Sequence, residues 1–159
     1  MITYFISGHR DITPAEFSRS YSQMILSVQP SAGEEATFVV GECAGVDSMA
    51  QDFIHALNNP GIHVVVYHMF TKPRYNPYNY PTAGGYQNDY DRDCAMTMAS
   101  DEDILWVRPG KENSGTAQNK VRREMFNCFK TLRKKDRLAI LQSWGKMYGI
   151  ELQEICIFR

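Results

Sequence analysis

The sequence predicts an α/β protein, a Rossmann-like three-layer sandwich with a mainly parallel sheet and helices on both faces. Short apolar runs rich in β-branched and aromatic residues alternate four times with segments of helical spacing. This alternation indicates parallel strands joined by helical crossovers. The run from His63 to Tyr67 is apolar throughout its centre, which is typical of a strand covered on both faces.

The first half of the chain contains two strand–helix units. Residues 2–7 form a β-rich apolar run. A helix over residues 13–28 is expected next, because its first four residues (TPAE) combine an N-cap, a proline at the first helical position and a capping-box glutamate. Residues 37–40 form the second predicted strand, and a helix over residues 45–57 ends at the stop signal NNPG.

The second half repeats the pattern after a long interruption. A segment rich in proline, tyrosine and asparagine follows the third strand, from residue 71 to 85. A helix over 91–99, a strand over 104–107 and a helix over 116–132 are then expected. Residues 133–159 are predicted to add a helix and an edge strand.

Composition fits one globular domain over residues 1–159. The apolar share of 43% and the charged share of 22% are ordinary, and the formal net charge of −1 gives no reason to expect nucleic acid or an anionic membrane as the main partner. We expect no membrane span and no signal peptide. The four cysteines form no CxxC pair, which fits reduced thiols and a cytoplasmic location.

The stretch from Ile104 to Arg122 combines a strand, a polar loop and a helix start. Ser114, Gly115 and Thr116 open the helix. The first backbone N–H groups of a helix have no internal partner, and the macrodipole favours an anion there. The sequence therefore predicts an anion site at this helix start, although an ordinary N-cap without a ligand would give the same pattern.

In sheets of this kind, ligands bind beyond the carboxyl ends of the strands. The loops expected there supply glycines, hydroxyls, arginines and several carboxylates, which together suit a sugar-phosphate ligand. Four segments are predicted to meet at this edge: residues 8–11, 41–47, 70–90 and 111–116.

Several motifs in these segments occur in a fixed order. SGHR follows the first strand, GECAGVDSMA follows the second, and SGTAQN follows the fourth. Gly85 with Arg92-Asp93 and Met96 stands in place of a G-x-x-R-N-x-x-M motif, at wider spacing. Over residues 2–125 the chain resembles the SLOG superfamily of Rossmann-like proteins, which includes the Lonely-guy phosphoribohydrolases and the DNA-processing protein A core, and it is most similar to the compact YspA/YpsA-like members.

The resemblance implies a nucleotide or nucleoside-phosphate ligand, with the phosphate on the Gly-Thr pair and an arginine nearby. The hydrolytic relatives carry a glutamate three residues after that pair, where this chain has Asn119. An amide can neither take up a proton nor act as a carboxylate nucleophile, so Asn119 weakens the transfer of that activity. The candidate ligand-binding residues are Ser7, Gly8, His9, Arg10, Gly41, Gly45, Arg92, Ser114, Gly115, Thr116 and Asn119.

Cleavage of an N-glycosidic bond requires a carboxylate that stabilises an oxocarbenium-like centre by charge, by nucleophilic attack or by activating water. The candidate catalytic residues are Glu42, Asp47 and Asp91. Glu42 follows the second strand directly and could replace the missing glutamate. Asp47 could equally cap the next helix without touching a ligand, and an acidic residue such as Asp91 is expected at a helix start from the dipole alone.

Two functions remain open from the sequence. One is an enzyme for N-glycosidic cleavage or glycosyl transfer on a nucleoside monophosphate or an ADP-ribose-like ligand, similar to a phosphoribohydrolase or a deoxyribosyltransferase. The other is a non-catalytic nucleotide-binding module, which Asn119 favours. The near-neutral charge disfavours a DNA-binding relative.

Partners and cofactors are less constrained. No His or carboxylate spacing indicates a metal site, and no cofactor is expected. The resemblance implies a homo-oligomer, a dimer or higher. The tyrosines of the 71–90 loop fit base stacking, packing over the sheet edge or a subunit interface equally well.

Overall fold

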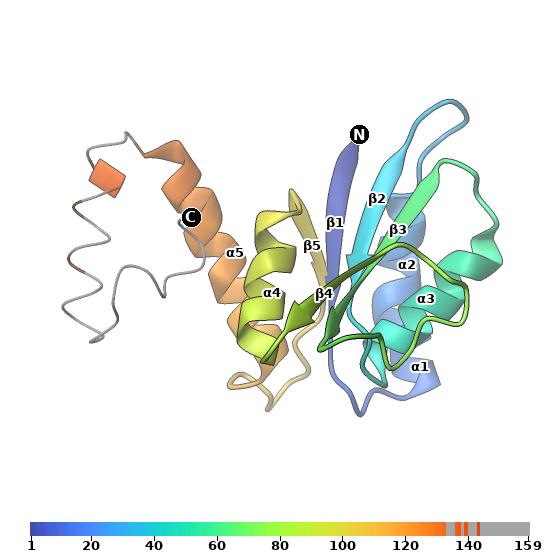
Figure 1. The fold of residues 1–159 in the computed structure, drawn as a ribbon, viewed down its shortest axis with the longest axis horizontal. Helices are drawn as coiled ribbons and strands as arrows, with labels where there is room; N and C mark the ends of the chain where they lie inside the picture. Colours follow the sequence, from blue (N-terminus) through green and yellow to red (C-terminus); the bar gives the residue numbers. More distant parts are fainter. Residues whose placement is uncertain (133–135, 138, 140–142, 144–159) are drawn as a thin grey trace.

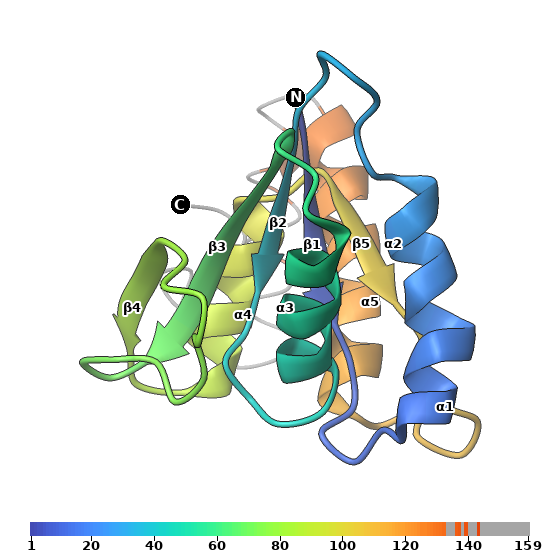
Figure 2. The ribbon, with the colours of Figure 1, turned by 90° about the vertical axis from the view of Figure 1, so that its right-hand side faces the viewer.

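Five parallel strands form one sheet in the order β4-β3-β2-β1-β5 (Figures 1 and 2). The structure is a computed structural model that describes residues 1–132, 136, 137, 139 and 143. The strands are β1 (Ile2–Ser7), β2 (Ala36–Val40), β3 (Ile62–Met69), β4 (Thr82–Tyr86) and β5 (Glu102–Leu105).

Helices cover both faces of the sheet, so the predicted three-layer α/β architecture is confirmed. One face carries α1 (Pro14–Phe17), the π-helical turn η1 (Ser18–Ser22), α2 (Gln23–Ser27) and α3 (Val46–Leu57). The opposite face carries α4 (Asp89–Met98) and α5 (Gly115–Thr131), as Figure 1 shows edge-on. The predicted capping box at Thr13 is present and begins a continuous helical segment through α1, η1 and α2.

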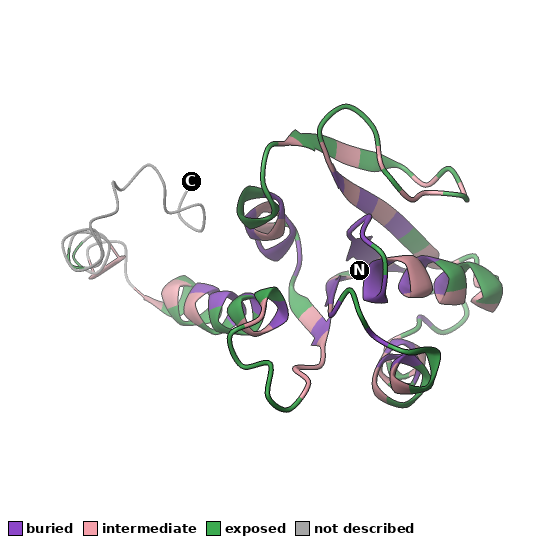
Figure 3. Ribbon diagram, turned by 90° about the horizontal axis from the view of Figure 1, so that it is seen from below, coloured by how far each residue is buried: buried purple, intermediate pink, exposed green. Residues whose placement is uncertain are grey.

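The two faces bury different kinds of surface. Successive strand residues point to opposite faces, so Tyr4 and Ile6 join a cluster of fifteen buried apolar residues under α1–α3, whereas Phe5 faces α4 and α5. On that second face the described residues form a buried apolar cluster of three, Phe5, Val39 and Met96. Figure 3, viewed from below Figure 1, shows buried residues concentrated on the inner strands of the sheet, whereas the edge strand β4 is largely exposed.

Strand β5 is displaced from its predicted position at residues 104–107. It begins at Glu102 and ends at Leu105. Both main-chain polar groups of Trp106 meet the buried Tyr21 hydroxyl, which accepts from the Trp106 N–H at 3.1 Å and lies 3.3 Å from its carbonyl. This side-chain contact removes Trp106 from the strand ladder, and it could not be deduced from the apolar pattern.

Strand β4 lies within the segment that was predicted as a loop. Its sequence, TAGGY, lacks the alternation typical of a strand, and it forms by adding to the edge of β3. A Cβ at Gly84 would lie 2.0 Å from the His68 ring, so glycine there lets the two strands pack closely.

Residues 70–81 take the place of a crossover helix between β3 and β4. The Tyr78 hydroxyl donates to Asp52 on α3 at 2.7 Å, and the Tyr78 ring stacks on His55 with centroids 3.8 Å apart. Tyr75 also donates to Asp52. Of the three roles that the sequence left open for these tyrosines, the contacts of Tyr75 and Tyr78 match packing within the chain.

The predicted C-terminal helix and edge strand fall on residues 133–159, nearly all of which lie outside the described residues. Within the described part of the chain, no helix is both long enough and apolar enough to cross a membrane.

Replacing Tyr21 by Phe should lower the free energy of unfolding by about 1–3 kcal/mol, because the Trp106 N–H and the Ser7 carbonyl lose a buried partner. Tyr78→Phe is the matched control, since its hydroxyl bonds Asp52 at an exposed position and its loss should cost less than about 0.5 kcal/mol. Urea denaturation measures both variants, and equal losses would contradict this role for Tyr21.

Candidate functional site

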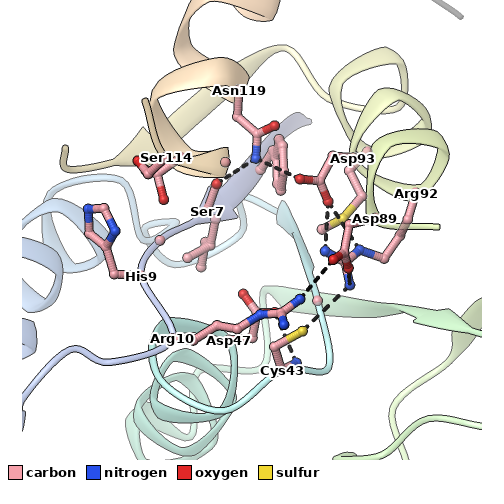
Figure 4. A pocket seen from close by; sticks show the side chains of 17 residues that line it. Ser7, His9, Arg10, Cys43, Asp47, Asp89, Arg92, Asp93, Ser114 and Asn119 are labelled. Atoms are coloured by element: carbon pink, nitrogen blue, oxygen red, sulfur yellow. Dashed lines mark hydrogen bonds and ion pairs between the residues drawn. The ribbon is translucent and has the colours of Figure 1, made fainter. Parts of the chain in front are cut away.

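A cavity of about 340 Å³ opens at the carboxyl ends of β1 and β2, between the α4 and α5 starts (Figure 4). Eleven of the residues predicted from the sequence line it: Ser7, Gly8, His9, Arg10, Gly41, Asp47, Arg92, Ser114, Gly115, Thr116 and Asn119. The cavity is also lined by Phe5, Ile6, Cys43, Asp89, Asp93 and Met96. Glu42, Gly45 and Asp91 are not among its lining residues.

The start of α5 faces this cavity. Ser114 is the N-cap, and its hydroxyl accepts from the Ala117 N–H at 3.3 Å. The first main-chain bond of the helix runs from Gln118 to Ser114. The N–H groups of Gly115 and Thr116 therefore precede the helical ladder, and neither has a hydrogen-bond partner among the described residues. A Cβ at Gly115 would meet no atom within 4 Å, so this helix start is open rather than plugged by a side chain.

Gly8 and Gly45 have packing roles next to the cavity. A Cβ at Gly8 would lie 2.2 Å from Val46 and 2.5 Å from the Tyr21 hydroxyl, so only glycine lets β1 end against α3. Gly45 has a φ of +86°, and a Cβ there would lie 2.4 Å from the His9 carbonyl oxygen. Gly45 thus supports the 8–10 segment from behind rather than lining the cavity.

Asn119 is held in one orientation by three neighbours. Its Nδ2 donates to Ser7 Oγ at 2.7 Å and to Asp93 Oδ2 at 3.0 Å, and its Oδ1 accepts from Arg122. The guanidinium can only donate and the carboxylate accepts, so the amide cannot be reversed. The Ser7 oxygen accepts from Asn119, which leaves its own hydrogen free to donate to a ligand.

Arg92 and Asp93 form a buried pair on α4. The side chain of Arg92 is 7% exposed, and its Nη2 and Nε donate to Asp93 Oδ1 at 2.8 and 3.1 Å. Asp89 bridges the two arginines of the site, at 3.2 Å from Arg92 and 2.9 Å from Arg10. Arg10 is therefore both a cavity residue and one partner of an exposed ion pair.

His9 is buried against the loop after β5. Its Nε2 accepts from the Arg108 N–H at 3.0 Å, so in the neutral ring the proton lies on Nδ1. Burial and the charge of Arg108 lower the pKa of His9, which favours this neutral form. His9 can therefore donate one hydrogen bond from the cavity wall without adding a charge.

Asp47 is a buried carboxyl group on the α3 side of the cavity. One oxygen accepts from the Cys43 N–H at 3.0 Å. Burial raises the pKa of Asp47 to about 6, although the charge of Arg92 and the Cys43 N–H act in the opposite direction. A carboxyl group that titrates near neutral pH beside a cavity is suited to proton transfer.

Glu42 and Asp91 are engaged elsewhere. The fully buried Glu42 side chain accepts from the Met69 N–H at 2.8 Å and from the main chain and side chain of Arg74. Although burial opposes it, these donors lower the pKa of Glu42. Asp91 lies in the exposed first turn of α4, where it pairs with the N-cap Asn88. Glu42 thus holds the segment that follows β3 against the end of β2. Asp91 is part of the N-terminal cap of α4.

Sequence reasoning passed over Asp89, Asp93, Cys43 and Met96 as site residues. The helical period carried a signal for three of them. Asp89, Asp93 and Met96 share one face of α4 at spacings of four and three, whereas Asp91 is five residues from Met96 and points elsewhere. No comparable signal singled out Cys43.

Among the described residues, no group of three or more His, Cys, Asp or Glu side chains could hold a metal ion. Comparison of the chain with protein-family models, with curated proteins and with solved structures finds no match. The function is therefore argued from the cavity itself.

The raised pKa of Asp47 predicts a pH-dependent stability. Its protonated form favours the fold, so this contribution is complete below about pH 4 and is lost as the pH rises through about 6. The free energy of unfolding of Asp47→Asn should therefore rise relative to that of the wild type between pH 4 and 7, by up to about 3 kcal/mol. Urea denaturation across this pH range measures the difference.

Glu42→Gln is the control of opposite sign. The folded-state pKa of Glu42 is lowered, so its contribution is present above its ordinary pKa of 4.5 and is lost as the pH falls below it. The wild type should have a higher free energy of unfolding than Glu42→Gln at neutral pH, and this difference should shrink as the pH falls below 4.5. Asp47→Asn curves parallel to the wild type at every pH would contradict the first prediction.

Proposed function

We propose that this protein is a SLOG-type nucleotide-processing enzyme that cleaves or transfers across the N-glycosidic bond of a nucleoside monophosphate or an ADP-ribose-like compound. One observation carries the proposal: the unpaired first-turn amides of α5 and the buried carboxyl of Asp47 line the same cavity. A phosphate-binding group and a proton-transfer group are thus within reach of one small ligand.

The phosphate is assigned to the start of α5. The Gly115 and Thr116 N–H groups are the donors that a helix N-terminus offers to an anion, and a helix of 17 residues has a full dipole. No neighbouring atom lies within 4 Å of the position that a Cβ at Gly115 would take, so the space beside this helix start is open. The charges of Arg10 and Arg92 are largely balanced by Asp89 and Asp93. The main-chain N–H groups are therefore the main hydrogen-bond donors available to a bound anion.

The sugar is assigned to the floor of the cavity. The Ser7 hydroxyl and His9 Nδ1–H are donors beside the α5 start, and sugar hydroxyls are suitable acceptors for them. A volume of about 340 Å³ is within the range of small-molecule sites.

Asp47 is assigned as the proton donor to the departing base. With a pKa of about 6, part of its population is protonated near neutral pH, and the ionised form can take a proton back. This role needs no glutamate at position 119.

A second candidate function is a non-catalytic module that binds the same ligand. The specific observation in its favour is Asn119, an amide whose polar atoms are all engaged by Ser7, Asp93 and Arg122. An amide held in this way can position neighbours but cannot supply a carboxylate.

A nucleotide panel separates the two functions. The full chain is incubated with nucleoside 5′-monophosphates, ADP-ribose, unphosphorylated nucleosides and inorganic phosphate, and melting temperature and free base are both measured. Phosphorylated compounds should raise the melting temperature, since a ligand bound only by the folded state stabilises it. Release of free base supports the enzyme, stabilisation without base supports the binding module, and no stabilisation by any phosphorylated compound overturns both.

Gly115→Pro tests the assigned phosphate site. Proline is tolerated at the first helical position, and the extended Ser114 (φ −74°, ψ 164°) suits a residue before proline, so folding should persist while one N–H is removed. We expect about 10- to 100-fold weaker binding of the stabilising nucleotide by titration calorimetry, the value of one hydrogen bond to a charged group. Gly115→Ala, which keeps the N–H, should bind as the wild type does. Equal affinity of the two variants would place the phosphate elsewhere.

A further inference from the structure

We propose that Asp93 is the carboxylate that faces the anomeric carbon of the nucleotide, with Arg92 and Asn119 acting as positioning residues. The inference rests on the proposed function and adds the residue that this function otherwise lacks. Asp93 was not among the carboxylates that the sequence suggested.

Three hydrogen bonds fix the Asp93 side chain at the cavity wall. Its Oδ1 accepts from Arg92 Nη2 and Nε at 2.8 and 3.1 Å, and its Oδ2 accepts from Asn119 Nδ2 at 3.0 Å. The side chain is 14% exposed, on a residue that lines the cavity (Figure 4). One carboxylate oxygen is thus occupied by the guanidinium, and the other has a single partner and capacity for one more.

This arrangement suits stabilisation by charge. Both oxygens of Asp93 accept from fixed donors, Oδ1 from the Arg92 guanidinium, which is 7% exposed, and Oδ2 from the Asn119 amide. Because Asn119 is itself held by Ser7 and Arg122, the Asp93 oxygens cannot turn away from the cavity without breaking their hydrogen bonds to Arg92 and Asn119. A fixed negative charge next to a developing cation needs no reorganisation during the reaction.

The other carboxylates fit this role less well. Glu42 does not line this cavity, and its carboxylate already accepts hydrogen bonds from Met69 and Arg74. Asp89 is half-exposed and paired with both arginines. Asp47 is buried with a raised pKa, which suits proton transfer rather than a permanent charge.

The two aspartates together complete hydrolysis. As the bond between C1′ and the base nitrogen breaks, its electron pair goes to the base, and Asp47 gives its proton to that base. The Asp93 carboxylate stabilises the positive charge on the sugar. Water then adds to C1′ and its proton passes to the Asp47 carboxylate, so a nucleoside monophosphate and water yield the sugar phosphate and the free base.

Asp93→Asn should lower the turnover of the active nucleoside monophosphate by about 100-fold or more, the size of a lost electrostatic or acid–base contribution. Nucleotide-induced stabilisation should persist, since the α5 amides are untouched. Asp91→Asn is the matched control, because it removes the same charge two residues away on the same helix but outside the cavity, and it should keep wild-type turnover.

The exchange variant Asp93→Asn/Asn119→Asp moves the carboxylate across the 3.0 Å hydrogen bond and keeps the net charge. It should recover at least about tenfold of the turnover lost in Asp93→Asn, and it serves in place of the single variant should that one fail to fold. If the exchange variant binds nucleotide but has no more turnover than Asp93→Asn, or no measurable turnover where that variant does not fold, the assignment is overturned.

Two failures are distinguishable. Wild-type protein that binds nucleotide but releases no base overturns the enzymatic proposal, and the role of Asp93 with it. Wild-type turnover that survives in folded Asp93→Asn overturns Asp93 alone and reduces it to a structural partner of Arg92.

Discussion

The pairing of buried charged and polar groups between α4, α5 and the sheet is the constraint on which the site depends. The α1–α3 face is held by a cluster of fifteen buried apolar residues, but the buried apolar cluster on the α4–α5 face has three members among the described residues. Buried ion pairs add to the packing of this face. Arg123 on α5 pairs with Asp103 on β5 at 2.7 Å, and Arg92 pairs with Asp93. A buried charge without a partner is costly. These side chains are therefore confined to the positions in which they satisfy one another, which gives the cavity a wall of fixed polar groups.

Much of the fold could be predicted from the sequence because its strongest signals are local. The capping box at Thr13 and the stop after Leu57 operate within a few residues, and both helices have the expected bounds. Strands β4 and β5 required long-range partners instead. β4 depends on the free edge of β3, and the charged start of β5 is acceptable because Arg123 on α5 reaches Asp103. Neither partner is close in sequence, so β4 was not predicted and β5 was predicted two residues too late.

The loops of the candidate site could be predicted, whereas the chemistry of individual side chains could not. Parallel topology brings strand ends and helix starts to one edge, and eleven predicted residues indeed line one cavity. Position after a strand says nothing about the direction of a side chain. Glu42 follows β2 as expected, yet it turns toward Met69 and Arg74. Asp93 was not among the carboxylates predicted from the sequence, although its spacing from Met96 places it on the inner face of α4.

Positions 93 and 119 are two places where this chain differs from the SLOG-like pattern that it resembles. In that pattern the arginine of the third motif is followed by asparagine, and the Gly-Thr pair is followed by glutamate after three residues; this chain has Asp93 and Asn119. The two side chains are joined by a 3.0 Å hydrogen bond, so relative to the pattern that the resemblance implies, the amide and the carboxylate stand at each other's positions. Asn119 is therefore compatible with the proposed enzymatic function, because the carboxylate of Asp93 lines the same cavity. Under the proposed function, the carboxylate is supplied by α4, where Asp93 lies 2.8 Å from Arg92, and proton transfer is assigned to Asp47 on the opposite face of the sheet.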